Sequence, residues 1–104
     1  MKIDDVTAAI ELGRVRVTHR ADEELHAHGL TIEEVCAAML HGEIVEQDPV
    51  EKRPFPSCRA SGRLRNDTSV HAVWAWNPKN GWTALINAYR PETAARESGP
   101  AGGA

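Results

Sequence analysis

The sequence predicts an α+β domain, with helices in the first part of the chain and strands in the rest. Three early stretches repeat apolar residues at helical spacing, and each is followed by a glycine. Further along, β-branched and aromatic residues dominate, and an Asn-Gly pair separates the two longest apolar runs. Helices segregated from strands in this way favour a mainly antiparallel sheet with the helices packed on one of its faces.

Residue types at the ends of the stretches define the expected helices. Asp4 and Asp5 suit the first turn of a helix, and Thr18 can cap a second one. Thr31 and Glu34 form a capping box ahead of a third. We therefore expect helices over Ile3–Leu12, Thr18–His28 and Ile32–His41.

Alternation of side-chain types defines the expected strands. The stretch Ser57–Arg65 places small or apolar residues on one face and polar residues on the other. Asn80-Gly81 predicts a hairpin with a primed turn, because glycine and asparagine adopt positive φ at low cost. We expect a short edge strand over Arg14–Thr18 and longer strands over Glu43–Gln47, Ser57–Arg65, Val70–Asn77 and Trp82–Tyr89. Between Glu43–Gln47 and Ser57–Arg65, the prolines Pro54 and Pro56 predict that Val50–Pro56 is an extended loop.

Length and composition set the class of protein. A chain of 104 residues has room for one domain, which we place at residues 1–91. The stretch Glu92–Ala104 is rich in Gly, Ala and Ser, so we expect a disordered C-terminal tail. The net charge of −3 argues against indiscriminate nucleic-acid binding. No apolar run approaches the roughly 18 residues that a membrane span needs, so we expect a cytoplasmic protein that does not enter a membrane.

Neither the cysteines nor the histidines match a cofactor motif. Cys36 and Cys58 are predicted to be reduced, largely buried apolar side chains. His26, His28 and His41 are too irregularly spaced for a metal site. We therefore expect no metal and no other cofactor.

Several short motifs, in order along the chain, point to a family. Gly42-Glu43-Ile44-Val45-Glu46 is followed by Val70-His71-Ala72-Val73 and then by Ala88-Tyr89-Arg90-Pro91. This succession resembles the bacterial domain of unknown function 4258, over roughly Val15–Glu92. Members of that family look like relatives of the RelE/BrnT-type toxins. The resemblance implies N-terminal helices on a four-stranded sheet and, where activity is known, cleavage of RNA.

The resemblance and the residues together indicate candidate catalytic groups. His71 can serve as general acid or base for attack by a ribose 2′-hydroxyl, with Tyr89 and His19 in support. An odd-numbered hairpin loop would place His71 opposite Tyr89, whereas an even-numbered loop would place them on opposite faces. The alternative is structural: His71 bonds a neighbouring carbonyl, and Tyr89 buries its ring. At the start of the second helix, either His19 or Arg20 occupies the position where the family has a histidine.

Arginines supply the candidate RNA-binding strip, because their guanidinium groups bind phosphate oxygens in a bidentate manner. The alternative is a solvated face whose arginines pair with Glu43 and Glu46. The tryptophans would stack on bases if exposed, but the pattern around Trp74 and Trp76 favours burial beneath the helices. The candidate RNA-binding residues are Arg59, Arg63, Arg65 and Arg90.

Two functions therefore remain open from the sequence. The first is a RelE/BrnT-like, metal-independent endoribonuclease of a toxin–antitoxin pair, with RNA or the ribosome as target and an antitoxin protein as partner. The second is a non-catalytic module that binds a protein or a small ligand on the same sheet. A contiguous Arg/His cleft would favour the first, and an acidic or apolar sheet face the second.

Overall fold

The computed structural model describes residues 1–48 and 55–91, and it confirms an α+β fold. The predicted tail, and most of the predicted loop Val50–Pro56, lie outside these residues. The helices are α1 (Ile3–Glu11), α2 (His19–Ala27) and α3 (Ile32–Met39). The strands are β1 (Val15–Val17), β2 (Glu43–Gln47), β3 (Ser57–Arg63), β4 (Ser69–Asn77) and β5 (Trp82–Tyr89). Each lies within two residues of its predicted bounds.

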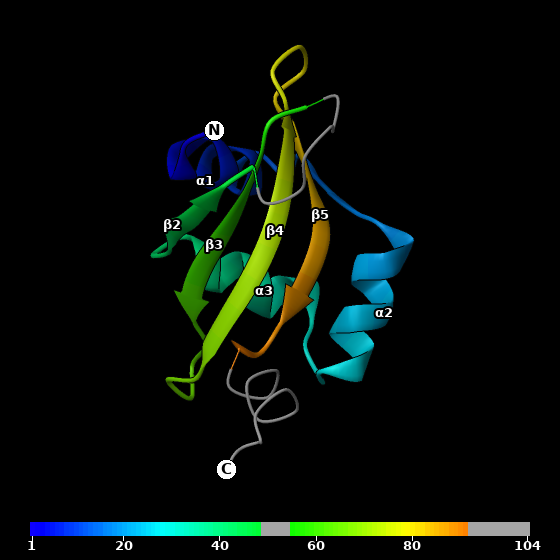
Figure 1. The fold of residues 1–104 in the computed structure, drawn as a ribbon, viewed down its shortest axis with the longest axis vertical. Helices are drawn as coiled ribbons and strands as arrows, with labels where there is room; N and C mark the ends of the chain where they lie inside the picture. The colour runs from blue at the N-terminus through cyan, green and yellow to red at the C-terminus, as the bar shows by residue number, and fades with distance from the viewer. Residues whose placement is uncertain (49–54, 92–104) are drawn as a thin grey trace.

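The sheet has five strands, in the order β1-β5-β4-β3-β2, so the four-stranded sheet that the resemblance implied was wrong. Figure 1 shows β2 to β5 side by side. β2 to β5 are antiparallel neighbours, as predicted, whereas β1 pairs in parallel with β5. The reason is that backbone bonds tie the short basic segment to β5 on both sides of β1. The amide of Thr83 donates to the carbonyl of Arg14, and the amide of Thr18 donates to the carbonyl of Leu85.

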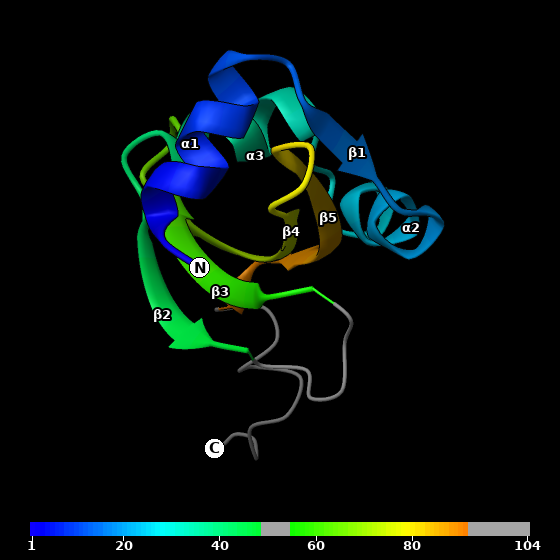
Figure 2. The same ribbon diagram turned by 90° about the horizontal axis from the view of Figure 1, so that it is seen from above.

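The sheet curves, and α1 and α3 cover its concave face while α2 lies alongside β5 (Figure 2). The core fills this concavity, and Trp74 of β4 is its largest fully buried side chain. That burial confirms the prediction for Trp74. Trp76 is half-buried, and Trp82 is 38% exposed.

Local capping determines where the helices begin. The hydroxyl of Thr18 accepts a hydrogen bond from the amide of Ala21 at 3.2 Å. In the predicted capping box, the amide of Glu34 donates to the Thr31 hydroxyl at 3.1 Å, and the Glu34 carboxylate accepts from the Thr31 amide at 3.0 Å. Each cap supplies partners for amides that the first turn of a helix leaves unpaired.

At Gly62, α3 lies directly against β3. A Cβ atom at this position would lie 2.5 Å from the carbonyl oxygen of Ala38 in α3. Glycine therefore allows the helix backbone to rest directly on the strand. This contact holds β3 in place, and β3 carries part of the candidate site.

The turn between β4 and β5 differs from the predicted primed turn. The hairpin has a four-residue loop, from Pro78 to Gly81, and within it only Gly81 has a positive φ, of +72°. The amide of Gly81 donates to the carbonyl of Asn77 at 2.8 Å and closes the loop. The hairpin prediction is confirmed, but the turn type was wrong because Asn80 keeps a negative φ.

Candidate functional site

The candidate site lies on the outer face of the sheet, which we define as the face turned away from α1 and α3. Along β4, Val70, Ala72 and Trp74 are buried on the helix side. The intervening residues His71, Val73 and Ala75 therefore belong to the outer face. Val73 is itself buried, so this face has an apolar centre with polar groups around it.

His71 and Tyr89 are directly opposed on neighbouring strands. Their ring centroids lie 5.6 Å apart, at an interplanar angle of 68°, in an edge-to-face arrangement. Edge-to-face contacts between aromatic rings are favourable and limit the freedom of both rings. The predicted catalytic pair thus shares one face of the sheet.

A β-bulge creates this pairing. The hairpin loop is four residues long, and from the turn onward Asn77 pairs with Trp82 and Trp74 with Leu85. That register alone would place Tyr89 on the face opposite to His71. The register shifts by one residue at Ile86 of β5, so that the strand reverses which residues face outward. The bulge is therefore what brings Tyr89 to His71.

Two polar residues that the sequence did not single out share this face. Ser61 of β3 pairs with His71 on the side away from Tyr89, so the three form one row across the sheet. In the next row, Asn87 pairs with Val73. In the sequence, these two residues are marked only by their outward positions in the alternation of β3 and β5. That signal identifies them as neighbours of His71 and Val73 only when the register between the strands is known.

The row of Val73 holds two buried polar atoms without partners. Arg59 pairs with Val73 from the β3 side, and Asn87 pairs with it from the β5 side. Both the Nε of Arg59 and the Oδ1 of Asn87 are buried with no hydrogen-bond partner within the described part of the chain. Such atoms cost free energy in a folded protein, and a catalytic role or a bound water or ion is among the reasons that a protein keeps them.

Most of the predicted RNA-binding arginines contact other groups of the protein. Arg59 forms an ion pair with Glu46 of β2, which confirms one of the two predicted acidic partners. Arg63 contacts the Asp67 carboxylate at 3.4 Å in the turn that follows β3. Arg65 lies beyond the end of β3 and is exposed. These side chains therefore do not form one uninterrupted cationic strip.

Arg90 joins two segments at the end of β5. Its Nε donates to the carbonyl of His28 at 3.1 Å, and its Nη1 donates to the Thr68 hydroxyl at 3.2 Å. The first bond reaches the end of α2, and the second reaches the turn before β4. Both bonds hold Arg90 in a structural position beside the candidate pair.

His19 is not part of the row formed by His71 and Tyr89. It begins α2, where its side chain is 87% exposed and contacts Glu23 at 3.6 Å. The neighbouring Thr18 is anchored to Leu85, four residues before Tyr89 on β5. Four residues of strand span roughly 13 Å. His19 therefore begins α2 at a distance from the candidate pair of His71 and Tyr89.

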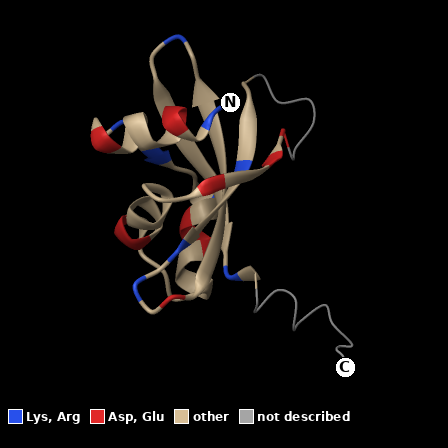
Figure 3. Cartoon of the chain, turned by 90° about the vertical axis from the view of Figure 1, so that its left-hand side faces the viewer, with Lys and Arg blue, Asp and Glu red and all other residues tan. Residues whose placement is uncertain are grey.

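Charge is interspersed over the surface. Both acidic and basic positions are found on the side of the molecule seen in Figure 3. Ion pairs such as those of Arg59 and Arg63 reduce the positive field that a phosphate would feel. The sheet face is thus mixed in charge, which differs from the contiguous basic cleft expected of an RNA-cleaving face.

The thiols are poor nucleophiles. Burial raises the pKa of the Cys58 thiol to about 11, and burial followed by the nearby Glu33 carboxylate raises that of Cys36. Both are free cysteines, as predicted. Among residues 1–48 and 55–91, no group of three or more His, Cys, Asp or Glu side chains is arranged to hold a metal ion. Nor is any helix in these ranges long and apolar enough to cross a membrane.

Comparison with known proteins gives a family assignment. Searches of the curated proteins and of the solved structures found no match to the chain. A family model does match, over residues 17–90, which include both members of the His71–Tyr89 pair and the bulge between β4 and β5. Because the match covers well over half of the chain, the protein belongs to the family described as Domain of unknown function (DUF4258).

Proposed function

We propose that the protein is a metal-independent endoribonuclease of the RelE/BrnT type, and that RNA is cleaved on the outer face of the sheet. The observation that carries the proposal is the opposition of His71 and Tyr89, with ring centroids 5.6 Å apart, on a face shared with Ser61 and Arg59. A histidine beside a phenol supplies two groups that can exchange protons, as cleavage without a metal requires. An antitoxin protein would be the partner that restrains this activity.

The chemistry assigns one proton to each group. His71 in its neutral form accepts the proton of the ribose 2′-hydroxyl as the oxygen attacks the adjacent phosphorus. A bond forms between phosphorus and the 2′-oxygen, and the bond from phosphorus to the 5′-oxygen breaks. The Tyr89 hydroxyl gives its proton to that departing oxygen. The products are a 2′,3′-cyclic phosphate and a 5′-hydroxyl, and Arg59 or Arg63 offsets charge on the phosphate.

A second candidate is a module that binds a ligand or protein on the same face without catalysis. The engagement of Arg59 by Glu46, and of Arg63 by Asp67, favours it, because ion-paired guanidinium groups are less available to phosphate. The two candidates differ in a simple observable, namely whether RNA is cut. They share the prediction that a change at His71 affects function.

Incubation of the purified chain with single-stranded RNA, with and without ribosomes, tests the proposal. We expect cleavage, and we expect His71→Ala to slow it by roughly 10²–10⁴-fold, the usual contribution of a general acid or base. His26→Ala is the matched control, because this histidine is exposed on α2 and bonds only within its own helix. Intact RNA in every reaction of the folded wild-type protein would leave the binding module as the better account.

A further inference from the structure

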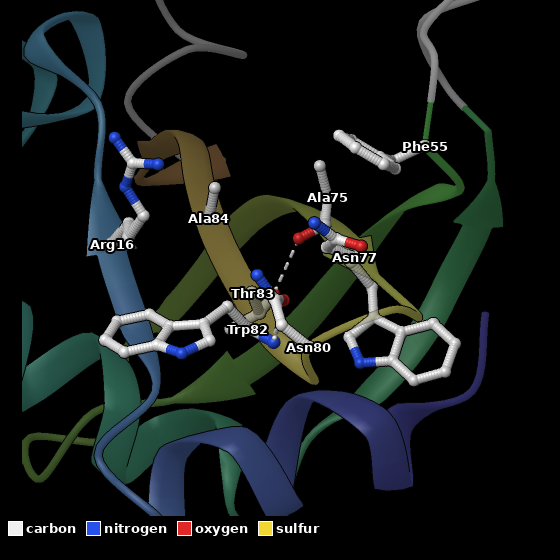
Figure 4. A pocket seen from close by; sticks show the side chains of 9 residues that line it. Arg16, Phe55, Ala75, Asn77, Asn80, Trp82, Thr83 and Ala84 are labelled. Carbon is white, nitrogen blue, oxygen red and sulfur yellow. Dashed lines mark hydrogen bonds between the residues drawn. The ribbon is translucent and has the colours of Figure 1, made fainter.

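A second candidate site lies on the outer face, at the loop end of the β4–β5 hairpin. It is a cavity of about 300 Å³ at the opposite end of β4 from His71. Ala75 and Ala84 form its floor as a directly opposed pair, and Arg16 of β1 pairs with Ala84 on the other side (Figure 4). Two small side chains in adjacent strands leave the space that the surrounding larger residues enclose.

Exposed aromatic rings border this cavity. Phe55 is 39% exposed and Trp82 is 38% exposed, and they lie on opposite sides of the alanine floor (Figure 4). An exposed ring offers its face to another planar group. Stacking of a nucleic-acid base on an aromatic side chain is worth roughly 1–3 kcal/mol. The cavity is therefore suited to a flat aromatic ligand.

The polar groups of the cavity are mostly hydrogen-bond donors. The Oδ1 of Asn77 accepts from the amide of Lys79 at 2.9 Å, and the Oδ1 of Asn80 accepts from the amide of Trp82 at 3.0 Å. With each amide oxygen engaged, the NH₂ groups remain to donate to a ligand. A ligand that meets these groups must carry acceptor oxygens or ring nitrogens.

Cationic groups stand beside those donors. Arg16 lines the cavity and has no ion pair among the residues that the structure describes. Arg14 lies close by, where its Nη1 donates to the carbonyl of Asn80 at 3.3 Å. The described lining contains no carboxylate. Positive charge without a neutralising partner favours an anionic group, and the fork of a guanidinium fits a phosphate.

We propose that this cavity binds one unpaired nucleotide, with its base against Trp82 or Phe55 and its phosphate on Arg16. The choice of a nucleotide over another planar anion rests on the proposed function. Ala75 and His71 lie four residues apart on β4, or roughly 13 Å, on the same face. A nucleotide held here would thus anchor an RNA strand that continues toward His71 and Tyr89. The volume is at the lower end of the range for small-ligand sites, as a single nucleotide requires.

Nuclear magnetic resonance of the ¹⁵N-labelled full chain tests the site directly. Three tryptophans give three indole signals, and Trp82→Phe identifies that of Trp82. We expect adenosine 5′-monophosphate to shift the Trp82 signal and to leave that of the buried Trp74 unchanged. Arg16→Ala should weaken this binding about 10-fold, because a charge-assisted phosphate contact is lost. The matched control is Arg20→Ala, which removes an exposed arginine outside the cavity.

Two further ligands separate the chemistries. Adenosine lacks the phosphate, so its weaker binding should not respond to Arg16→Ala. Benzoate carries a ring and an anion without a base, and a Trp82 shift with benzoate but none with the nucleotide would overturn the proposal. So would an Arg16→Ala variant that binds the nucleotide as tightly as the wild type.

The test also separates this site from the proposed ribonuclease. Nucleotide binding that persists in His71→Ala, from a protein that cuts no RNA, would support the cavity and contradict the proposed function. RNA cleavage by a protein whose Trp82 signal does not shift with the nucleotide would support the proposed function and contradict nucleotide binding in the cavity. The two proposals therefore succeed or fail on different measurements.

Discussion

Replacement of Gly62 by alanine tests whether the contact between α3 and β3 is as close as the structure has it. The added Cβ atom would lie 2.5 Å from the Ala38 carbonyl oxygen, 2.8 Å from its carbonyl carbon and 3.1 Å from its Cβ. The nearest of these is backbone, which cannot move aside by changing rotamer. To reach an ordinary contact of 3.4 Å, the helix would have to retreat by roughly 0.9 Å.

Two opposing effects determine how much Gly62→Ala changes the free energy of unfolding. Forced overpacking of a core costs about 1–3 kcal/mol. Exchange of glycine for alanine recovers about 0.4–1 kcal/mol by restricting the unfolded chain. We therefore expect Gly62→Ala to lower the free energy of unfolding by about 1–2 kcal/mol. For a domain of this size, that corresponds to a fall in Tm of roughly 4–16 °C.

Urea denaturation followed by tryptophan fluorescence measures this loss, because Trp74 reports on the core. Ser61→Ala is the matched control, since it changes the adjacent residue of the same strand on the outer face. We expect this control to alter stability by less than about 0.5 kcal/mol. A Gly62→Ala variant as stable as the wild type would show that α3 does not rest on β3 as described.

Four other tests probe separate parts of the fold. The raised pKa of Cys58 favours the protonated thiol in the folded state. The stability that this thiol contributes is therefore complete below pH ~8.5 and is lost as the pH rises toward about 11. Urea denaturation from pH 7.5 to 10.5 measures this loss, which should be smaller in Cys58→Ala. Thiol labelling at pH 8 should modify the half-buried Cys36 before Cys58, and equal rates would contradict the burial of Cys58. Thr31→Ala removes the hydroxyl that accepts from the Glu34 amide, while the backbone amide of residue 31 can still donate to the Glu34 carboxylate, and it should cost about 1 kcal/mol in urea denaturation, with no loss expected if α3 begins elsewhere. Arg90→Lys keeps the charge but cannot span both of its bonds, so we expect a loss of about 1–2 kcal/mol, and an unchanged urea midpoint would show that these bonds carry no stability.

Local patterns in the sequence were sufficient to predict the helices and strands of this fold. The Thr31–Glu34 capping box, the apolar spacing of the helices and the alternation of β3 each depend on neighbours within a few residues. The parallel pairing of β1 was missed because its stabilising bonds reach residues nearly 70 positions away in β5. The local pattern of Arg14–Thr18 indicated an edge strand, but it contained no signal for the partner strand or for the parallel direction of the pairing.

The arrangement of the candidate site depends on one bulged residue, Ile86, which the sequence did not indicate. An even-numbered hairpin loop should have separated His71 from Tyr89, and only the bulge at Ile86 restores them to one face. Bulges arise where the twist and packing of two strands require them, which a pattern of residue types does not record. The register of β4 and β5 therefore had to come from the structure.

The cavity was missed for a related reason. Arg16, Phe55 and Trp82 come from three separate segments, and none belongs to a local motif. Arg16 appeared as one basic residue of a short strand, and Trp82 as one of three tryptophans. Their common surface exists only because β1 joins the edge of β5 beside the hairpin. The three residues are far apart in the sequence and become neighbours only through the pairing of the strands.

Expression in a bacterial host under tight induction tests the central claim most directly. We expect the wild type to arrest growth and to produce new 5′ ends in total RNA, His71→Ala to abolish both effects, and His26→Ala to retain them. His26 is a suitable control because it lies on the exposed side of α2. Normal growth and intact RNA, in cells that contain folded, soluble wild-type protein, would contradict the claim that the outer face of the sheet cleaves RNA.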